Sequence, residues 1–126
     1  MHEVSVAQSL VELIEAELAR HPWCGGRVVG AKLRIGELSG VVPAALKSAF
    51  GPATEGTCAD GAKLEIEPVP VVIWCDQCES EQVLAPPVQG LICPVCGKRA
   101  SEVLRGRELE LISVEVLQDS GAADVN

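Results

Sequence analysis

The sequence predicts an α+β fold in which two helices pack on a small mixed three-stranded sheet, with a four-cysteine module inserted before the last strand. Three observations support this prediction: helical spacing of apolar residues near the amino end, apolar and polar residues alternating in three segments, and cysteines in two close pairs. A chain of 126 residues has room for one domain carrying a smaller module. We expect the larger domain to comprise residues 1–70 and 107–118, the module residues 71–106, and residues 119–126 to form a disordered tail.

The two predicted helices differ in how clearly the sequence marks them. Apolar residues recur at intervals of three and four through residues 4–20, and this helix should end near His21, because a proline follows and disfavours helical backbone before it. Pro43 suits the first turn of a second helix, since the first helical position needs no backbone N–H. We expect that helix over about residues 44–50, up to Gly51–Pro52.

Three segments show the two-residue period of half-buried strands, namely residues 28–35, 63–67 and 108–116. In the last segment the apolar residues change phase between Leu111 and Ile112. This change of phase predicts a β-bulge near that point, because one extra residue turns every following side chain to the other face. Together the three segments form the expected sheet.

The composition excludes several classes of partner. A formal net charge of −8 repels phosphate backbones and anionic membrane surfaces, so neither nucleic acid nor a membrane is an expected partner. The amino end lacks a basic, apolar leader pattern, and no apolar run approaches the length of a membrane span. We therefore expect a cytoplasmic protein.

Four of the six cysteines form two C-x-x-C pairs separated by fourteen residues. They are Cys75, Cys78, Cys93 and Cys96. This spacing is typical of structural zinc sites and predicts a zinc-ribbon-like module, in which four thiolates close a tetrahedron and leave no open position for catalysis. A module of about 35 residues buries too little apolar surface to fold alone, so the metal would supply its folding free energy.

Other chemistry for these cysteines stays open to a limited extent. An iron–sulfur cluster or a rubredoxin-like iron site uses the same four thiolates. Disulfides are disfavoured in a reducing cytoplasm, and a redox pair would need a thioredoxin-like context. Cys24 and Cys58 lie outside the set and are expected to be small buried or half-buried thiols, with a metal or redox role left open.

The amino end offers a second group of metal donors. The Met1 α-amine, the His2 amide nitrogen and the His2 imidazole can bind one ion, and a planar nitrogen set is typical of Ni(II) or Cu(II). The Glu3 amide or carboxylate could complete this set. On these residues alone a solvated terminus explains His2 more simply. His21 is expected to be a helix-dipole partner or a solvated side chain.

Several segments together resemble the HypA/HybF family of nickel-incorporation proteins in nickel–iron hydrogenase maturation. They are Met1–Ser5, Val6–Ser9, Leu33–Ser39 and the four paired cysteines, and the resemblance extends from Met1 to about Val116. It implies a nickel metallochaperone and not an enzyme. Ni(II) would be a transient cargo bound by Met1, His2 and Glu3. Zn(II) would have a structural role, bound by Cys75, Cys78, Cys93 and Cys96.

The resemblance also implies partners. In the family these are a nickel-handling GTPase and the hydrogenase large subunit, with urease maturation proteins for some members, and homodimers occur. Some relatives place a histidine near the zinc cysteines, but residues 79–99 contain none, so an imidazole ligand from that loop is not expected. The alternative hypothesis is a zinc-ribbon protein-interaction adaptor without nickel function.

Overall fold

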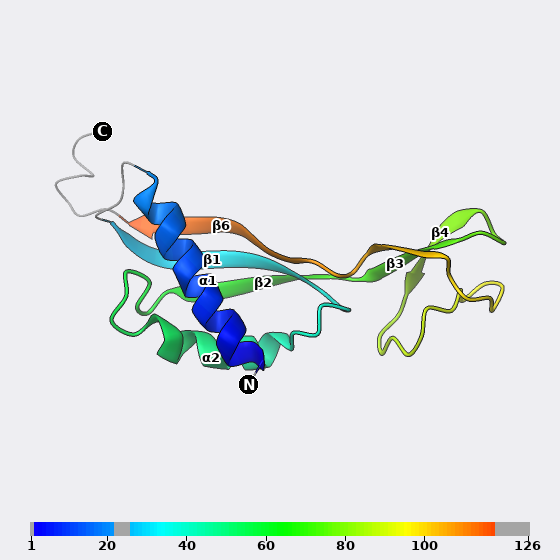
Figure 1. Cartoon of the computed structure of the whole chain (residues 1–126), viewed down its shortest axis with the longest axis horizontal. Helices are drawn as coiled ribbons and strands as arrows, with labels where there is room; N and C mark the ends of the chain where they lie inside the picture. Colours follow the sequence, from blue (N-terminus) through cyan, green and yellow to red (C-terminus); the bar gives the residue numbers. More distant parts are fainter. Residues whose placement is uncertain (1, 22–25, 118–126) are drawn as a thin grey trace. The chain divides into compact units, whose positions relative to one another are not determined.

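The chain divides into two compact units in the computed structural model, which describes residues 2–21 and 26–117 (Figure 1). Met1, Cys24 and the expected tail at residues 119–126 lie outside the described residues. Of the described residues, 2–21, 26–33, 42–66 and 111–117 belong to the first unit, and 34–41 and 67–110 belong to the second. This division places residues 34–41, 67–70 and 107–110 with the cysteines, whereas the sequence analysis placed them in the larger domain.

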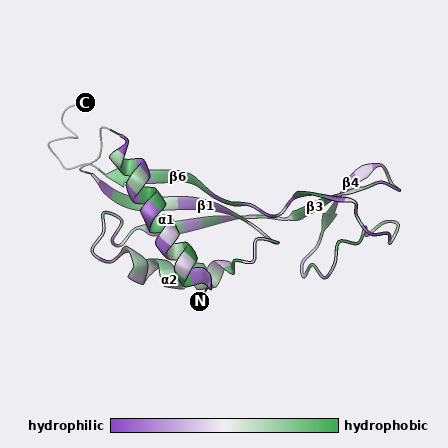
Figure 2. Cartoon of the chain, viewed as in Figure 1, coloured by the Kyte–Doolittle hydropathy of each residue, from purple (hydrophilic) through white to green (hydrophobic). Residues whose placement is uncertain are grey.

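The first helix, α1, spans His2–Ala19 and so begins two residues before the expected start. Glu3 lies in its first turn, where the positive end of the helix dipole stabilises a carboxylate. Hydrophobic and hydrophilic bands alternate along the helix (Figure 2). Its buried face consists of Ala7, Leu10, Val11, Ile14 and Leu18. Among the described residues, no helix is both long and apolar enough to cross a membrane.

The second helix, α2, spans Pro43–Thr54 and packs against α1. It starts at Pro43 as predicted but continues four residues beyond Phe50, the expected end. Phe50 and Thr54 are spaced one helical turn apart and are only 2% and 1% exposed. The Thr54 hydroxyl donates a hydrogen bond of 2.8 Å to the Gly51 carbonyl oxygen. Burial of this face thus outweighs the backbone bond that Pro52 cannot make.

The sheet contains β1 (Arg27–Gly36), β2 (Lys63–Val69) and β6 (Leu109–Leu117), in the order β2-β1-β6. Each strand agrees with its predicted segment to within two residues at either end. Figure 1 shows β1 and β2 running in the same direction and β6 in the opposite one, with α2 connecting the two parallel strands. The predicted mixed three-stranded sheet is therefore confirmed.

A hollow of about 260 Å³ between the end of α1 and β6 is lined by Glu17, Leu18, His21, Leu111, Ile112, Ser113, Val114 and Val116.

Two contacts between β1 and β6 locate an extra residue in β6. A Cβ on Gly30 would lie 3.5 Å from the Glu115 Cβ, and the Arg34 guanidinium lies 3.4 Å from a Glu110 carboxylate oxygen. Four steps along β1 thus correspond to five steps along β6. This mismatch indicates a β-bulge, and residues 111–112, where the sequence predicts one, fall inside the interval.

The second unit contains an antiparallel sheet of β3 (Val71–Cys75), β4 (Ser80–Leu84) and β5 (Glu102–Arg105), in the order β4-β3-β5. Leu38, from the turn after β1, packs against the core of this unit. The core itself consists of Val71, Ile73, Cys75, Leu84 and Cys93. Two cysteines therefore belong to the hydrophobic core, and the segment after β1 helps to cover them.

Candidate metal centre

The structure brings the four paired cysteines together in the second unit. Their sulfur atoms all lie within 4.8 Å of one another. The Cys75 and Cys96 sulfurs are 3.4 Å apart, and those of Cys78 and Cys93 are 3.9 Å apart. A tetrahedral zinc ion with Zn–S bonds of about 2.3 Å needs sulfurs about 3.8 Å apart. The four thiols therefore have the spacing that a single tetrahedral ion requires.

Backbone amides point at the sulfur atoms of both pairs. The Cys78 amide donates to the Cys75 sulfur at 3.4 Å, and the Val95 amide donates to the Cys93 sulfur at 3.4 Å. Such donors place partial positive charge beside the sulfur atom that accepts from them. Each C-x-x-C turn thus prepares its first cysteine to bind a cation.

The residue after each pair has left-handed backbone geometry. Glu79 follows the first pair with φ 53°, and Gly97 follows the second with φ 78°. The second turn is closed by the Gly97 amide, which donates to the Cys93 carbonyl oxygen at 2.9 Å, and by the Cys93 amide, which donates to the Lys98 carbonyl oxygen at 2.8 Å. Glycine adopts this geometry freely, whereas a glutamate in a sequence does not signal a left-handed residue, so the turn at Glu79 is visible only in the structure.

The pKa values of the thiols separate in this cluster. The backbone amide of Cys96, followed by that of Val95, lowers the pKa of Cys93 to about 7. Desolvation and the neighbouring sulfurs raise the pKa of Cys78. Four thiols in contact cannot all ionise without a counter-charge, and a bound divalent cation supplies one. The donor set therefore fits a tetrahedral thiophilic metal ion.

The amino-terminal candidates lie in the first unit. His2 is the first residue of α1 and is exposed, and Glu3 is half-buried. The Val42 amide donates a hydrogen bond of 3.2 Å to the Glu3 Oε2 atom. That bond is the largest cause of a lowered pKa at Glu3. The sequence analysis missed this contact, because 39 residues separate the two partners and no local pattern joins them.

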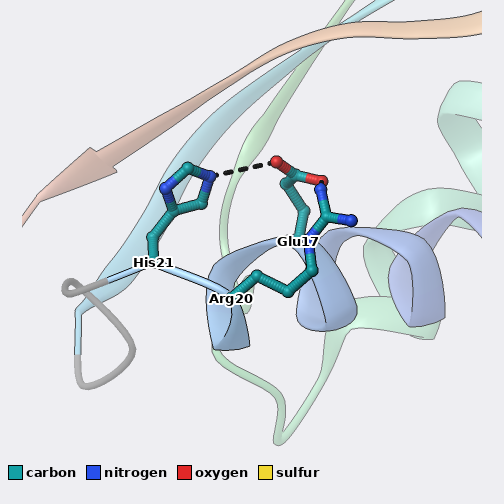
Figure 3. A network of polar contacts seen from close by, with 3 residues as sticks. All are labelled: Glu17, Arg20 and His21. Carbon is teal, nitrogen blue, oxygen red and sulfur yellow. Dashed lines mark hydrogen bonds and ion pairs between the residues drawn. The ribbon is translucent and has the colours of Figure 1, made fainter.

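His21 has a partner that the sequence analysis did not anticipate. Its Nε2 atom lies 3.0 Å from Glu17 Oε2, and Arg20 lies 2.6 Å from the other carboxylate oxygen (Figure 3). The hydrogen bond to His21, followed by the charge of Arg20, lowers the pKa of Glu17. The spacing of four residues from Glu17 to His21 is the signal that would have found this pair.

Cys58 is half-buried, as expected for a thiol outside the four-cysteine set. Desolvation, and then the charge of Glu15, raise its pKa. Among the described residues, Cys58 belongs to no cluster of His, Cys, Asp or Glu side chains that could hold a metal ion.

The helices and sheet of the first unit, the four clustered thiols of the second and the exposed His2 define a small metal-handling protein. Residues 1–116 match the family model described as "HypA: Hydrogenase/urease nickel incorporation, metallochaperone, hypA". The chain therefore belongs to the HypA family. It is a nickel-incorporation metallochaperone of hydrogenase maturation, and its four-cysteine cluster fits the zinc site expected for that function. The family match supports this function over that of an adaptor without nickel.

Curated relatives agree with the family model over nearly their whole length. The hydrogenase maturation factor HypA of Roseiflexus sp. (strain RS-1) is 42% identical over 123 residues, which cover 98% of each chain. The HypA of Picosynechococcus sp. is 40% identical over 117 residues, covering 93% of this chain and 100% of that one.

Solved structures also resemble the chain. The solution structure of the Ni metallochaperone HypA from Helicobacter pylori has a TM-score of 0.59 and 25% identity, covering 93% of this chain and 98% of that one. A second solution structure of a HypA protein has a TM-score of 0.61 and 28% identity, covering 94% and 98%.

Proposed function

We propose that this chain binds one Ni(II) ion at its amino end and delivers it during the maturation of nickel–iron hydrogenase. The nickel-binding residues are Met1, His2 and Glu3, through the α-amine, the His2 imidazole and the neighbouring amides. One observation carries this proposal: the exposed His2 stands at the first residue of α1. The first amides of a helix have no carbonyl partner within it, so a metal can take their place without breaking the helix.

The second metal of the proposal is a structural Zn(II) held by Cys75, Cys78, Cys93 and Cys96. The sulfur spacing supports zinc, and so does a donor set that consists of four thiols. In this division of labour, residues 1–70 and 107–118 form the nickel-binding domain and residues 71–106 the zinc-binding domain. Neither metal serves catalysis, since the chain passes on an ion and converts no substrate.

The partners follow from the family. The names of the matched family and relatives refer to hydrogenase and urease nickel incorporation and to hydrogenase maturation. We infer a nickel-handling GTPase and the hydrogenase large subunit as partners in the cytoplasm, with urease maturation proteins as further candidates and a homodimer as the candidate assembly. The net charge of −8 also suits a carrier of divalent cations better than a binder of nucleic acid or membranes.

A Ni(II) titration of untagged, zinc-loaded protein tests the proposal. Calorimetry and absorption are measured on the wild type and on His2→Ala, with the first residue confirmed by mass spectrometry. We expect one tight site with a planar d–d band in the wild type and its loss in His2→Ala, while zinc content and helical signal stay unchanged. Nickel binding that does not depend on His2 would contradict the proposed site.

Cys75→Ser serves as the complementary variant. It removes one thiolate from the zinc set and should lower the zinc content and unfold the second unit, because the metal supplies that unit's folding free energy. Unchanged zinc stoichiometry in Cys75→Ser would contradict the zinc assignment and leave the nickel proposal standing.

A further inference from the structure

Glu3 lies at the point where the starts of two helices meet. It belongs to the first turn of α1, and its Oε2 atom accepts the hydrogen bond of 3.2 Å from the amide of Val42. Val42 is the N-cap residue of α2, and no side-chain cap bond is made there by α2 itself. The carboxylate of Glu3 therefore accepts from the N-cap amide of α2, the bond that a Glu or Gln at the third helical position makes in a capping box and that Ala45 cannot make here.

We propose that the Glu3 carboxylate positions the nickel site and does not itself coordinate the ion. The inference rests on the proposed nickel site at the amino end and assigns roles within it. The carboxylate holds the first turn of α1 against the start of α2, and the amide nitrogens of His2 and Glu3 are left as donors. Glu3 then contributes to the site through its backbone.

The contact prepares the chelate in two ways. The first residues of a helix tend to fray, and ordering them around an ion costs conformational entropy. The bond from Val42 to Glu3 already orders these residues in the metal-free protein, so less of this cost falls on nickel binding. The starts of α1 and α2 also carry partial positive charge, which opposes the approach of a divalent cation. A carboxylate between them reduces this repulsion while its oxygen remains bonded to Val42.

Two substitutions of Glu3 separate positioning from coordination. Glu3→Ala removes the acceptor and should weaken Ni(II) binding about five- to tenfold, the loss expected for one hydrogen bond. Glu3→Gln keeps an oxygen that can accept from Val42 and should stay within about threefold of the wild type. Equal losses in the two variants would show that the ion needs the carboxylate, and would overturn the proposal.

Substitutions of Val42 test the same bond from its other end. Val42 is 55% exposed with φ −91°, so Val42→Pro removes the amide hydrogen with little change in packing. Its carbonyl oxygen still accepts from the Leu46 amide. We expect Val42→Pro to weaken nickel binding as much as Glu3→Ala, with little further loss when the two are combined. Val42→Ala keeps the donor and should bind like the wild type. Wild-type affinity in Val42→Pro would overturn the proposal.

A measurement without metal completes the test. In the nickel-free protein, Glu3→Ala should shift the Val42 amide resonance and speed its hydrogen exchange, while thermal unfolding confirms that each variant is folded. An unmoved Val42 resonance would overturn the tether. His2→Ala distinguishes a failure of the proposed nickel site from a failure of the positioning role. Nickel binding that is retained in His2→Ala would contradict the site itself. Nickel binding lost in His2→Ala but unaffected in Glu3→Ala and Val42→Pro removes only the positioning role.

Discussion

Glu79 and Gly97 occupy equivalent positions, each directly after a C-x-x-C pair and each with a positive φ. For a residue with a Cβ this geometry costs about 1–2 kcal/mol, whereas glycine adopts it freely. We expect Gly97→Ala to lower the free energy of unfolding of the zinc-loaded protein by about 1 kcal/mol. Glu79→Gly should be neutral or slightly stabilising, because relief of strain offsets the greater freedom of glycine in the unfolded chain.

Denaturant unfolding and competition with a zinc-binding dye measure both variants side by side. The two substitutions act on matched turns, so each serves as the other's control. If Glu79→Gly destabilised the protein as much as Gly97→Ala does, the Glu79 side chain would have a role beyond completing the turn.

The stability of the first unit depends on pH through Glu17. Its pKa lies below the ordinary value of 4.5, mainly because His21 donates to the carboxylate and secondarily because Arg20 is close. A carboxylate with a lowered pKa in the folded state contributes stability that is complete above its unfolded pKa. That contribution is lost as the pH falls below 4.5 through the folded value.

Glu17→Gln should therefore remove part of the acid sensitivity of the first unit. The wild type is expected to lose thermal stability more steeply than Glu17→Gln between pH 5 and the acid-unfolding limit, as followed by the helical signal. Glu12→Gln, an exposed position on the same helix, is the control and should follow the wild type. Identical slopes for Glu17→Gln and the wild type would contradict the linkage.

At the scale of elements, the end of β1 passes close to the segment before β6 within the second unit. A Cβ on Gly36 would overlap the carbonyl group of Gly106, and one on Gly106 would lie 2.9 Å from the Val71 Cα. The crossing is held by backbone bonds from Gly36 to Glu108 at 2.7 Å and from Leu38 to Gly106 at 2.6 Å. Only backbone without side chains fits between these segments.

Gly36→Ala should accordingly destabilise the second unit by more than about 2 kcal/mol, because backbone atoms cannot move aside as a side chain can. Gly51→Ala is the matched control. A Cβ there meets no atom within 4 Å, and alanine favours the helix that contains it, so a gain of about 0.5–1 kcal/mol is expected. The free energy of unfolding, measured with denaturant for both variants, checks the contrast; equal effects would refute it.

The elements also show what the sequence predicts and what it leaves out. Local periodicity predicts α1, β1, β2 and β6, because each has one face against a core and therefore a regular pattern. It predicts the end of α2 four residues too early, because burial of Thr54 overrides the local signal of Gly51–Pro52. The spacing of the four cysteines predicts their cluster but does not predict β3, β4 or β5, the strands of their module. The Glu3 bond to Val42 lies beyond such reasoning, since only the folded chain brings the two together.

At the scale of the whole molecule, secondary structure is divided unequally between the units. Both helices lie in the first unit, whereas β3, β4 and β5 lie in the second with the cysteine cluster. Two of the five buried core residues of the second unit are cysteines, so its core is incomplete without the metal that holds them. The first unit has its own buried helical face and does not include the four paired cysteines.

Removal of zinc should therefore unfold one unit and spare the other. After treatment with a strong chelator, the helical circular dichroism signal is expected to persist, while the Trp74 environment in β3 changes and the amides of β3–β5 lose protection from hydrogen exchange. Trp74 is a suitable reporter, because its indole N–H donates to Asp76 inside the first C-x-x-C turn. Cys75→Ser should reproduce the chelated state without chelator. Loss of the helical signal together with zinc would contradict this independence, because it would make the whole chain a single cooperative unit that depends on the metal.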